Sequence, residues 1–284
     1  MSKIIITSDS TSDLSPELIE KYDIKILPLN IVSDTDSKKD GIEINAFEVF
    51  DYQRKTGKLL KTAAANVAEW GDFFGSFDDA EGIVNFTISS DMSSTFANSK
   101  IASESFENVY TIDSRNLSTG IGLLILTACD LRDQGLSAKE IYERIEALKP
   151  YVRSSFIIDT LEFLYKGGRC SALAAFGANL LKLKPCIEVA NGKMGVAKKY
   201  RGPITEVIKK YVKDKLEGID KIRLEKVFIT HTMEPENHFV VDEIIEYIKD
   251  NYDFKNIYET TAGCTVSVHC GPNTLGILFI EKTE

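Results

Sequence analysis

Runs of hydroxyl-bearing and acidic side chains directly follow several predicted strands of this chain. Such runs begin at Thr7, Ser89 and Asp113, each after a stretch rich in isoleucine, valine or phenylalanine. In sheets of parallel strands, ligands bind beyond the carboxyl ends of the strands. We therefore expect these runs to meet at one edge of a sheet, where their side chains are candidates for contact with a small ligand.

Each candidate also has a purely structural explanation. Asp9 and Ser94 could cap the helices that follow them, because these residue types are common at helix N-termini. In the second half of the chain, Arg169 follows two glycines that could simply end a helix. His269 precedes Gly271 and Pro272 and could be a hydrogen-bonded structural histidine. The residue types alone leave both interpretations open.

Motifs of nucleotide-binding enzymes and of metal sites are missing from the sequence. No Gly-x-Gly-x-x-Gly follows a strand, and no Walker phosphate loop is present. His231, His238 and His269 are not spaced with cysteine or carboxylate as metal ligands are, so we expect no metal site and no cofactor of the protein's own. A serine hydrolase using Ser93 and His269 stays conceivable, although no Gly-x-Ser-x-Gly elbow is present.

Composition describes a globular chain with reduced thiols. It has 284 residues, 43% of them hydrophobic, and a net charge of −9, which argues against binding to nucleic acid and limits membrane contact to a transient one. The five cysteines are scattered, and the amino terminus enters an isoleucine run without a cleavage pattern. We therefore expect a cytoplasmic protein.

Alternation of β-branched runs with helical patterns predicts an α/β fold. A helix pattern closes at Pro150 before an apolar run opens, so we predict two domains, 1–154 and 155–284, each a mainly parallel sheet flanked by helices. The acidic excess lies wholly in the first domain, with 16 basic and 25 acidic residues against 18 and 18 in the second.

Taken together, these segments resemble the DegV family, whose best-understood members are the fatty-acid-binding subunits of bacterial fatty acid kinase. The resemblance runs from about Ile4 to Phe279. It rests on sequence segments in the family's order, namely Thr-Ser-Asp-Ser-Thr-Ser-Asp-Leu at 7–14, Ile-Ser-Ser-Asp-Met-Ser-Ser-Thr at 88–95, Ile-Asp-Ser-Arg-Asn at 112–116, Asp-Thr-Leu-Glu-Phe-Leu-Tyr-Lys-Gly-Gly-Arg at 159–169 and His-Cys-Gly-Pro at 269–272.

The resemblance implies a ligand tunnel between two α/β domains that holds a long-chain fatty acid. It implies that Thr62 and Ser93 contact the carboxylate, and that Arg169 and His269 complete a polar network to which we add Asp9 and Ser94. The chain departs from the family's usual motifs at Ala63–Ala65, at Ser94 and at Asn273. The last two replace glycines, and their side chains narrow the loops near the head group.

The resemblance further implies that the chain is not itself an enzyme. A separate kinase subunit would supply ATP and Mg²⁺ and phosphorylate the bound carboxylate to an acyl phosphate. The segment 182–210 carries eight basic residues against Glu188 and Glu206, and we interpret Lys199 and Arg201 as candidates for docking this partner. A solvated surface explains the same charges, and a non-lipid carrier on the same fold is a further alternative.

Overall fold

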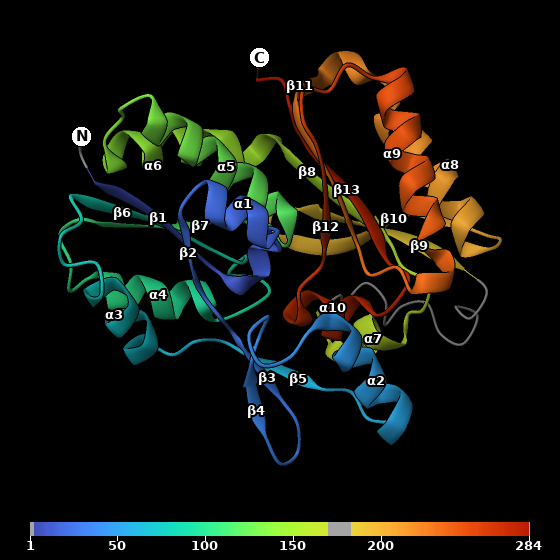
Figure 1. The fold of residues 1–284 in the computed structure, drawn as a ribbon, viewed down its shortest axis with the longest axis horizontal. Coiled ribbons are helices and arrows are strands. Elements are labelled where there is room, and N and C mark those ends of the chain that lie inside the picture. The colour runs from blue at the N-terminus through green and yellow to red at the C-terminus, as the bar shows by residue number, and fades with distance from the viewer. Residues whose placement is uncertain (1–2, 170–182, 284) are drawn as a thin grey trace.

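The computed structural model describes residues 3–169 and 183–283, and within these ranges the strands form three sheets. Figure 1 shows the two larger sheets side by side with helices around them, and the small third sheet beyond one end of the first. This arrangement confirms the predicted α/β fold class. None of the helices in the described ranges is long and apolar enough to cross a membrane.

The first large sheet is parallel, with the strand order β2-β1-β6-β7. Its strands carry apolar side chains on both faces because helices cover both, α5 and α6 on one and α3 and α4 on the other (Figure 1). The strands are β1 (Ile4–Asp9), β2 (Ile24–Leu27), β6 (Gly82–Thr87) and β7 (Val109–Asp113). The helices are α1 (Pro16–Lys21), α3 (Val67–Gly75), α4 (Thr95–Ser103), α5 (Thr119–Asp133) and α6 (Ala138–Leu148).

The second large sheet has the order β10-β9-β8-β13-β11-β12 and is mainly antiparallel, so the predicted parallel sheet is wrong for this half of the chain. β11 and β12 pair in parallel, across helix α9. The two-residue turn Asn191–Gly192 joins β9 directly to β10, and such a short connection permits only antiparallel pairing. The strands are β8 (Val152–Ile157), β9 (Lys184–Ala190), β10 (Lys193–Tyr200), β11 (Ile222–His231), β12 (Ile257–Thr261) and β13 (Leu275–Glu281).

Among the residues that the structure describes, four further α-helices belong to the second half of the chain. α8 and α9 pack against one another and cover an apolar core on one face of the second sheet. Strand β8 lies wholly in that sheet and begins before the predicted domain boundary at 154/155. The helices are α7 (Glu162–Gly167), α8 (Ile204–Leu216), α9 (Phe239–Asn251) and α10 (Cys264–Cys270).

A small antiparallel sheet, β4-β3-β5, projects from the first half of the chain. The sequence predicts one strand over residues 24–31, but Pro28 and Leu29 separate β2 from β3, and the chain changes sheet there. Helix α2 (Ala46–Thr56), capped by Asn45 as its sequence predicts, and helix α10 pack together beside this sheet. The strands are β3 (Asn30–Val32), β4 (Ser37–Lys39) and β5 (Lys61–Ala63).

The two halves of the chain share one apolar core. It joins Ile121 and Leu124 of α5 to Phe228 and Leu278 of the second sheet. Gly120 of α5 lies close to strand β8, because a Cβ there would lie 2.4 Å from Ser154 Oγ; it would also lie 2.2 Å from Asn116 Oδ1. The loops after the parallel strands lie against α10 and the β9–β10 hairpin.

Candidate ligand-binding site

A cavity of about 310 Å³ lies where the loops after β2, β6 and β7 meet β5, α10 and the β9–β10 hairpin. Apolar side chains form much of its wall, and a smaller set of polar side chains faces it as well. This composition is typical of sites for small organic ligands. The lining residues are Leu29, Thr62, Ala63, Ala64, Ile88, Met92, Ser93, Ser94, Leu117, Arg169, Met194, Thr265, Val266, His269 and Cys270.

Thr62 and His269 meet across the cavity wall although 207 positions separate them in sequence. Thr62 lies on β5 and His269 on α10, and Thr62 Oγ1 lies 3.0 Å from His269 Nε2. Burial, with the nearby positive charge of Arg169 as a second cause, lowers the pKa of His269 to about 4. The ring is therefore neutral at pH 7 and can share a hydrogen bond with a hydroxyl or with a ligand.

Gly167, the first glycine of the Lys-Gly-Gly-Arg segment, lies against the imidazole of His269. A Cβ at this position would lie 2.3 Å from His269 Nδ1, so any side chain would displace the imidazole. His269 Nδ1 itself is buried and has no hydrogen-bond partner among the described residues. Arg169 lies two residues further on, where its guanidinium donates to the Gly167 carbonyl at 2.8 Å and remains largely exposed at the cavity.

Ser93 belongs to a tight loop between β6 and α4, the serine loop (residues 89–94). The N–H groups of Met92 and Ser93 both bond to the carbonyl of Ser89, at 2.9 and 3.2 Å. Ser93 Oγ lies 2.8 Å from Thr95 Oγ1 and also accepts the Thr95 N–H at 3.2 Å. Ser94 lines the cavity and is exposed, and it makes no side-chain cap hydrogen bond to α4, so the capping interpretation is wrong for this residue.

The carboxylate of Asp9 binds the backbone at the start of this loop, and Asp9 does not line the cavity. Its carboxylate accepts the N–H of Thr11 at 2.9 Å and that of Ile88, just before the serine loop, at 2.8 Å. Burial raises the pKa of Asp9 to about 6, against the lowering effect of these hydrogen bonds. Asp9 thus caps the short helix that follows β1, as its residue type predicts, and also holds the start of the serine loop.

The β9–β10 hairpin closes against the serine loop. Ser89 Oγ donates to the carbonyl of Gly192 at 2.7 Å, and Arg115 donates to the carbonyl of Asn191 and pairs with Asp91. A Cβ at Gly192 would lie 2.5 Å from the Arg115 guanidinium carbon. The glycine therefore allows the hairpin turn to approach Arg115, and Met194, two residues further along the chain, lines the cavity.

Sequence reasoning missed two further acidic residues beside the cavity, Asp13 and Asp40. Both are buried, and both accept backbone N–H groups at the start of α10. Asp13 lies in the same hydroxyl-rich run as Asp9, which was the available signal. Asp40 lies in a charged segment with no neighbouring motif, and helix α10 itself was not predicted.

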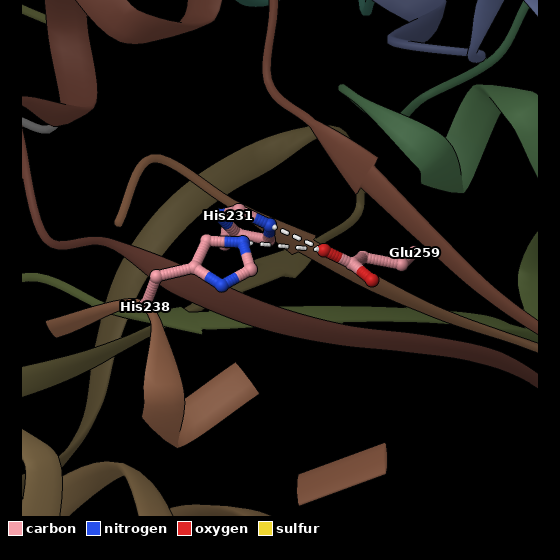
Figure 2. A group of neighbouring side chains, drawn as sticks. All are labelled: His231, His238 and Glu259. Carbon is pink, nitrogen blue, oxygen red and sulfur yellow. Dashed lines mark hydrogen bonds and ion pairs between the residues drawn. The ribbon is translucent and has the colours of Figure 1, made fainter. Parts of the chain in front are cut away.

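The structure brings together two histidines that the sequence spacing does not pair. His231, His238 and Glu259 place possible ligand atoms within 4.8 Å of one another (Figure 2). The N–H of Met233 donates to His231 Nδ1 at 3.1 Å, so the proton of the neutral ring lies on Nε2, 3.2 Å from Glu259 Oε1. A metal ion at Nε2 would require the proton to move to Nδ1, against that N–H. Hydrogen bonding therefore accounts for this cluster.

The predicted docking residues Lys199 and Arg201 border a separate groove of about 650 Å³ near the start of α8. Several basic side chains of segment 182–210 are paired with carboxylates, among them Lys198 with Asp214 and Lys209 with Glu243. Arg201 and Lys210 are exposed at this groove, and neither forms an ion pair with a described residue. Lys182 lies outside the described residues.

The geometry does not match the serine hydrolase alternative. His269 Nε2 faces Thr62, whereas Ser93 bonds to Thr95. In a Ser-His-Asp arrangement a carboxylate holds the second ring nitrogen, but His269 Nδ1 meets no such group among the described residues. Among the residues that the structure describes, none is placed as an oriented base that would activate Ser93.

Comparison with known proteins covers nearly the whole chain. Residues 3–282 match the model of the family described as uncharacterised proteins of the DegV family. A DegV domain-containing protein of Clostridium perfringens is 31% identical over 287 residues, covering 99% of this chain and 100% of that protein.

Solved structures share the fold. A DegV family protein of Thermus thermophilus, described by its fatty acid binding, aligns with a TM-score of 0.87 at 24% identity, over 99% of this chain and 100% of that one. A protein of Eubacterium ventriosum described as binding stearic acid aligns with a TM-score of 0.81 at 26% identity, over 99% of both chains.

Proposed function

The chain belongs to the DegV family, and we propose that it binds a long-chain fatty acid in the cavity and presents the carboxylate to a separate kinase subunit. The observation that carries this proposal is the cavity itself, in which apolar side chains lie beside the paired Thr62 and His269 and the hydroxyl of Ser93. Fatty acid binding described for similar proteins supports the same ligand class.

Apolar walls suit the acyl chain. Leu29, Ile88, Leu117, Val266 and other apolar side chains line the cavity. Each methylene that leaves water contributes about 0.8 kcal/mol before the cost of ordering the chain. The acyl chain would therefore supply most of the affinity, and the polar residues would decide which way the ligand points.

Hydroxyl donors suit a carboxylate that must still react. An ionised carboxylate buried without partners costs several kcal/mol, so Thr62 and Ser93 would donate to it, while Arg169 offers a nearby positive charge. Hydroxyls bond to the anion without cancelling its charge, which leaves an oxygen able to attack a phosphoryl group. We expect neutral His269 to orient the Thr62 hydroxyl toward the ligand.

The phosphoryl transfer belongs to the partner in this proposal. The sequence has no phosphate loop, and ATP and Mg²⁺ would come with the kinase subunit. Such a partner places the protein in the cytoplasm, where ATP is available. The groove at Lys199 and Arg201 offers positive charge to an acidic partner surface, and we propose it as the docking face.

Native mass spectrometry of gently purified protein tests the ligand class. The proposal expects an additional mass equal to a long-chain fatty acid, lost when the protein is delipidated and regained when palmitate is added. A protein that stays empty with palmitate but binds another small molecule would identify a non-lipid carrier. An acyl adduct on Ser93 after incubation with an ester would support a hydrolase.

Transfer is tested by adding a bacterial fatty acid kinase catalytic subunit and ATP to the palmitate-loaded protein. We expect acyl phosphate, trapped with hydroxylamine as the hydroxamate. If the protein binds palmitate but no acyl phosphate forms, the fatty acid remains the proposed ligand and the kinase partner is excluded from the proposal.

A further inference from the structure

Helix α10 carries His269 but begins without a side-chain cap of its own. Its N-cap residue is Gly263, so the N–H groups of its first turn need partners from elsewhere. Asp13 Oδ1 accepts the N–H of Gly263 at 2.9 Å. Asp40 accepts the N–H groups of Cys264 and Thr265 at 2.8 and 3.1 Å. Both carboxyl groups belong to the first half of the chain, whereas the helix belongs to the second.

The two carboxyl groups are themselves held in place. Ser118 donates to Asp13 Oδ2 at 2.6 Å, and Ser10 donates to Asp40 Oδ2 at 3.0 Å. Asp13 and Asp40 are only 6% and 4% exposed. A Cβ on Gly263 would lie 3.0 Å from Asp13 Oδ1, so the helix start approaches the carboxyl groups closely. These contacts form a fixed polar junction between the two halves of the chain.

This junction lies one helical turn from His269. Thr265 and His269 are four residues apart, which corresponds to about 6 Å along an α-helix. A tilt of the first turn would therefore move the imidazole away from Thr62 Oγ1, from which it is now separated by 3.0 Å. It would also move Val266 and Cys270, which line the cavity.

We propose that Asp13 and Asp40 are positioning residues for the ligand site, which cap α10 from the other half of the chain and so hold His269 against Thr62. Neither residue lines the cavity, so their effect on a ligand passes through the helix. The binding part of the test rests on the proposed fatty acid function, whereas the position of His269 is tested without ligand.

Asp13 and Asp40 differ in whether an asparagine amide could make the same hydrogen bonds as the carboxyl group. Asp13 faces one N–H and one hydroxyl, and a hydroxyl can reverse to accept a hydrogen bond. Asn at position 13 can therefore keep both contacts. Asp40 faces two backbone N–H groups, one at each oxygen, and an amide NH₂ cannot accept either. Asn at position 40 must leave one of these N–H groups without a partner.

The experiment compares Asp40→Asn and Asp13→Asn with a matched control, Asp34→Asn. Asp34 is exposed, pairs with Lys58 and lies away from α10, and its substitution makes the same change from a carboxyl group to an amide. Binding of the fluorescent probe cis-parinaric acid is measured. We expect Asp40→Asn to weaken binding about tenfold, Asp13→Asn no more than about threefold, and the control not at all.

A histidine NMR titration of the ligand-free protein reports the position of the ring directly. The His269 signal is assigned by its loss in His269→Ala. Its pKa of about 4 should rise toward the ordinary range in Asp40→Asn, because the displaced ring becomes hydrated, and should change little in Asp13→Asn. In a His269→Ala background, Asp40→Asn should cause little further loss of binding.

Three results would overturn the proposal. The first is an equal loss of probe affinity in the two Asn variants, and the second is an unmoved His269 signal in Asp40→Asn. The third is an Asp40→Asn substitution that causes its full loss of affinity even in the His269→Ala background. If Asp40→Asn does not fold, Ser10→Ala, which removes the hydroxyl that donates to Asp40 and accepts the Leu29 N–H at 3.1 Å, should shift the same signal by a smaller amount. An unmoved signal there overturns the proposal as well. If the wild-type protein binds no probe, the fatty acid function fails, and the titration still decides the role of the two residues.

Discussion

Replacing Thr62 by valine removes one hydroxyl with little change in shape and tests the polar end of the cavity most directly. Thr62 Oγ1 lies 3.0 Å from His269 Nε2 and faces the cavity, so the variant loses the proposed bond to the ligand and leaves the ring without that partner. A hydrogen bond to a charged group contributes about 1.5–3 kcal/mol. We therefore expect affinity for a fatty acid to fall by a factor between about 10 and about 100.

The assay compares an acid with an alcohol of the same chain length. Palmitate and hexadecanol compete with cis-parinaric acid, and the ratio of their dissociation constants isolates the head group from the apolar wall. Thr62→Val should weaken palmitate binding and leave hexadecanol binding within about twofold, because a neutral hydroxyl forms weaker bonds than a carboxylate. Thr35→Val, an exposed threonine outside the cavity, is the matched control.

Two results would refute the reasoning. An unchanged palmitate affinity would show that Thr62 does not contact the carboxylate. An equal loss for the acid and the alcohol would show that the substitution damages the cavity wall and that the head group lies elsewhere.

Three further predictions concern the histidine, the buried acids and the docking face. Gly167→Ala should lower both affinity and melting temperature because its Cβ would lie 2.3 Å from His269 Nδ1, whereas Gly71→Ala on α3, with open space around it, should do neither; equal behaviour would contradict this. The pKa values of Asp9 and Asp13 are raised by burial from 3.8 to about 6 and about 8, so the unfolded chain releases these protons first. The free energy of unfolding should consequently fall as pH rises between about 4 and 8, and in Asp13→Asn this fall should end near pH 6. Urea unfolding followed by Trp70 fluorescence measures both profiles. A variant profile identical to that of the wild-type protein would refute the raised pKa of Asp13. Lys199→Glu with Arg201→Glu should slow acyl phosphate formation without changing lipid affinity, while Lys139→Glu with Arg144→Glu on α6 should leave both unchanged; equal kinase rates for the two pairs would remove the docking face.

Local pattern was enough to predict most elements of the first half. Ser15 and Asn45 start their helices as their residue types predict, and the isoleucine and valine runs form β1, β6 and β7. The second sheet was predicted with the wrong strand direction. A short apolar run does not by itself fix the direction of the neighbouring strand. Here the Asn191–Gly192 hairpin and the long-range pairing of β8 with β13 make the sheet mainly antiparallel.

The candidate ligand-binding site was likewise predicted only in part. The motifs pointed to Thr62, Ser93, Arg169 and His269, and the structure places these residues around one cavity. They did not indicate that His269 would face Thr62, nor that a buried Asp40 would hold the helix that carries it. Such contacts join residues more than 200 positions apart, and no local periodicity records them.

By itself, the amino-acid sequence determined the α/β class, the family resemblance and the residue types available to bind a head group, because these depend on local pattern and on motifs. Only the tertiary structure decided the strand directions of the second sheet, the cavity between the loops and α10, and the junction at Asp13 and Asp40. Each of these depends on which buried N–H and C=O groups find partners across the two halves of the chain, and that is settled when the shared core of α5 and the second sheet packs.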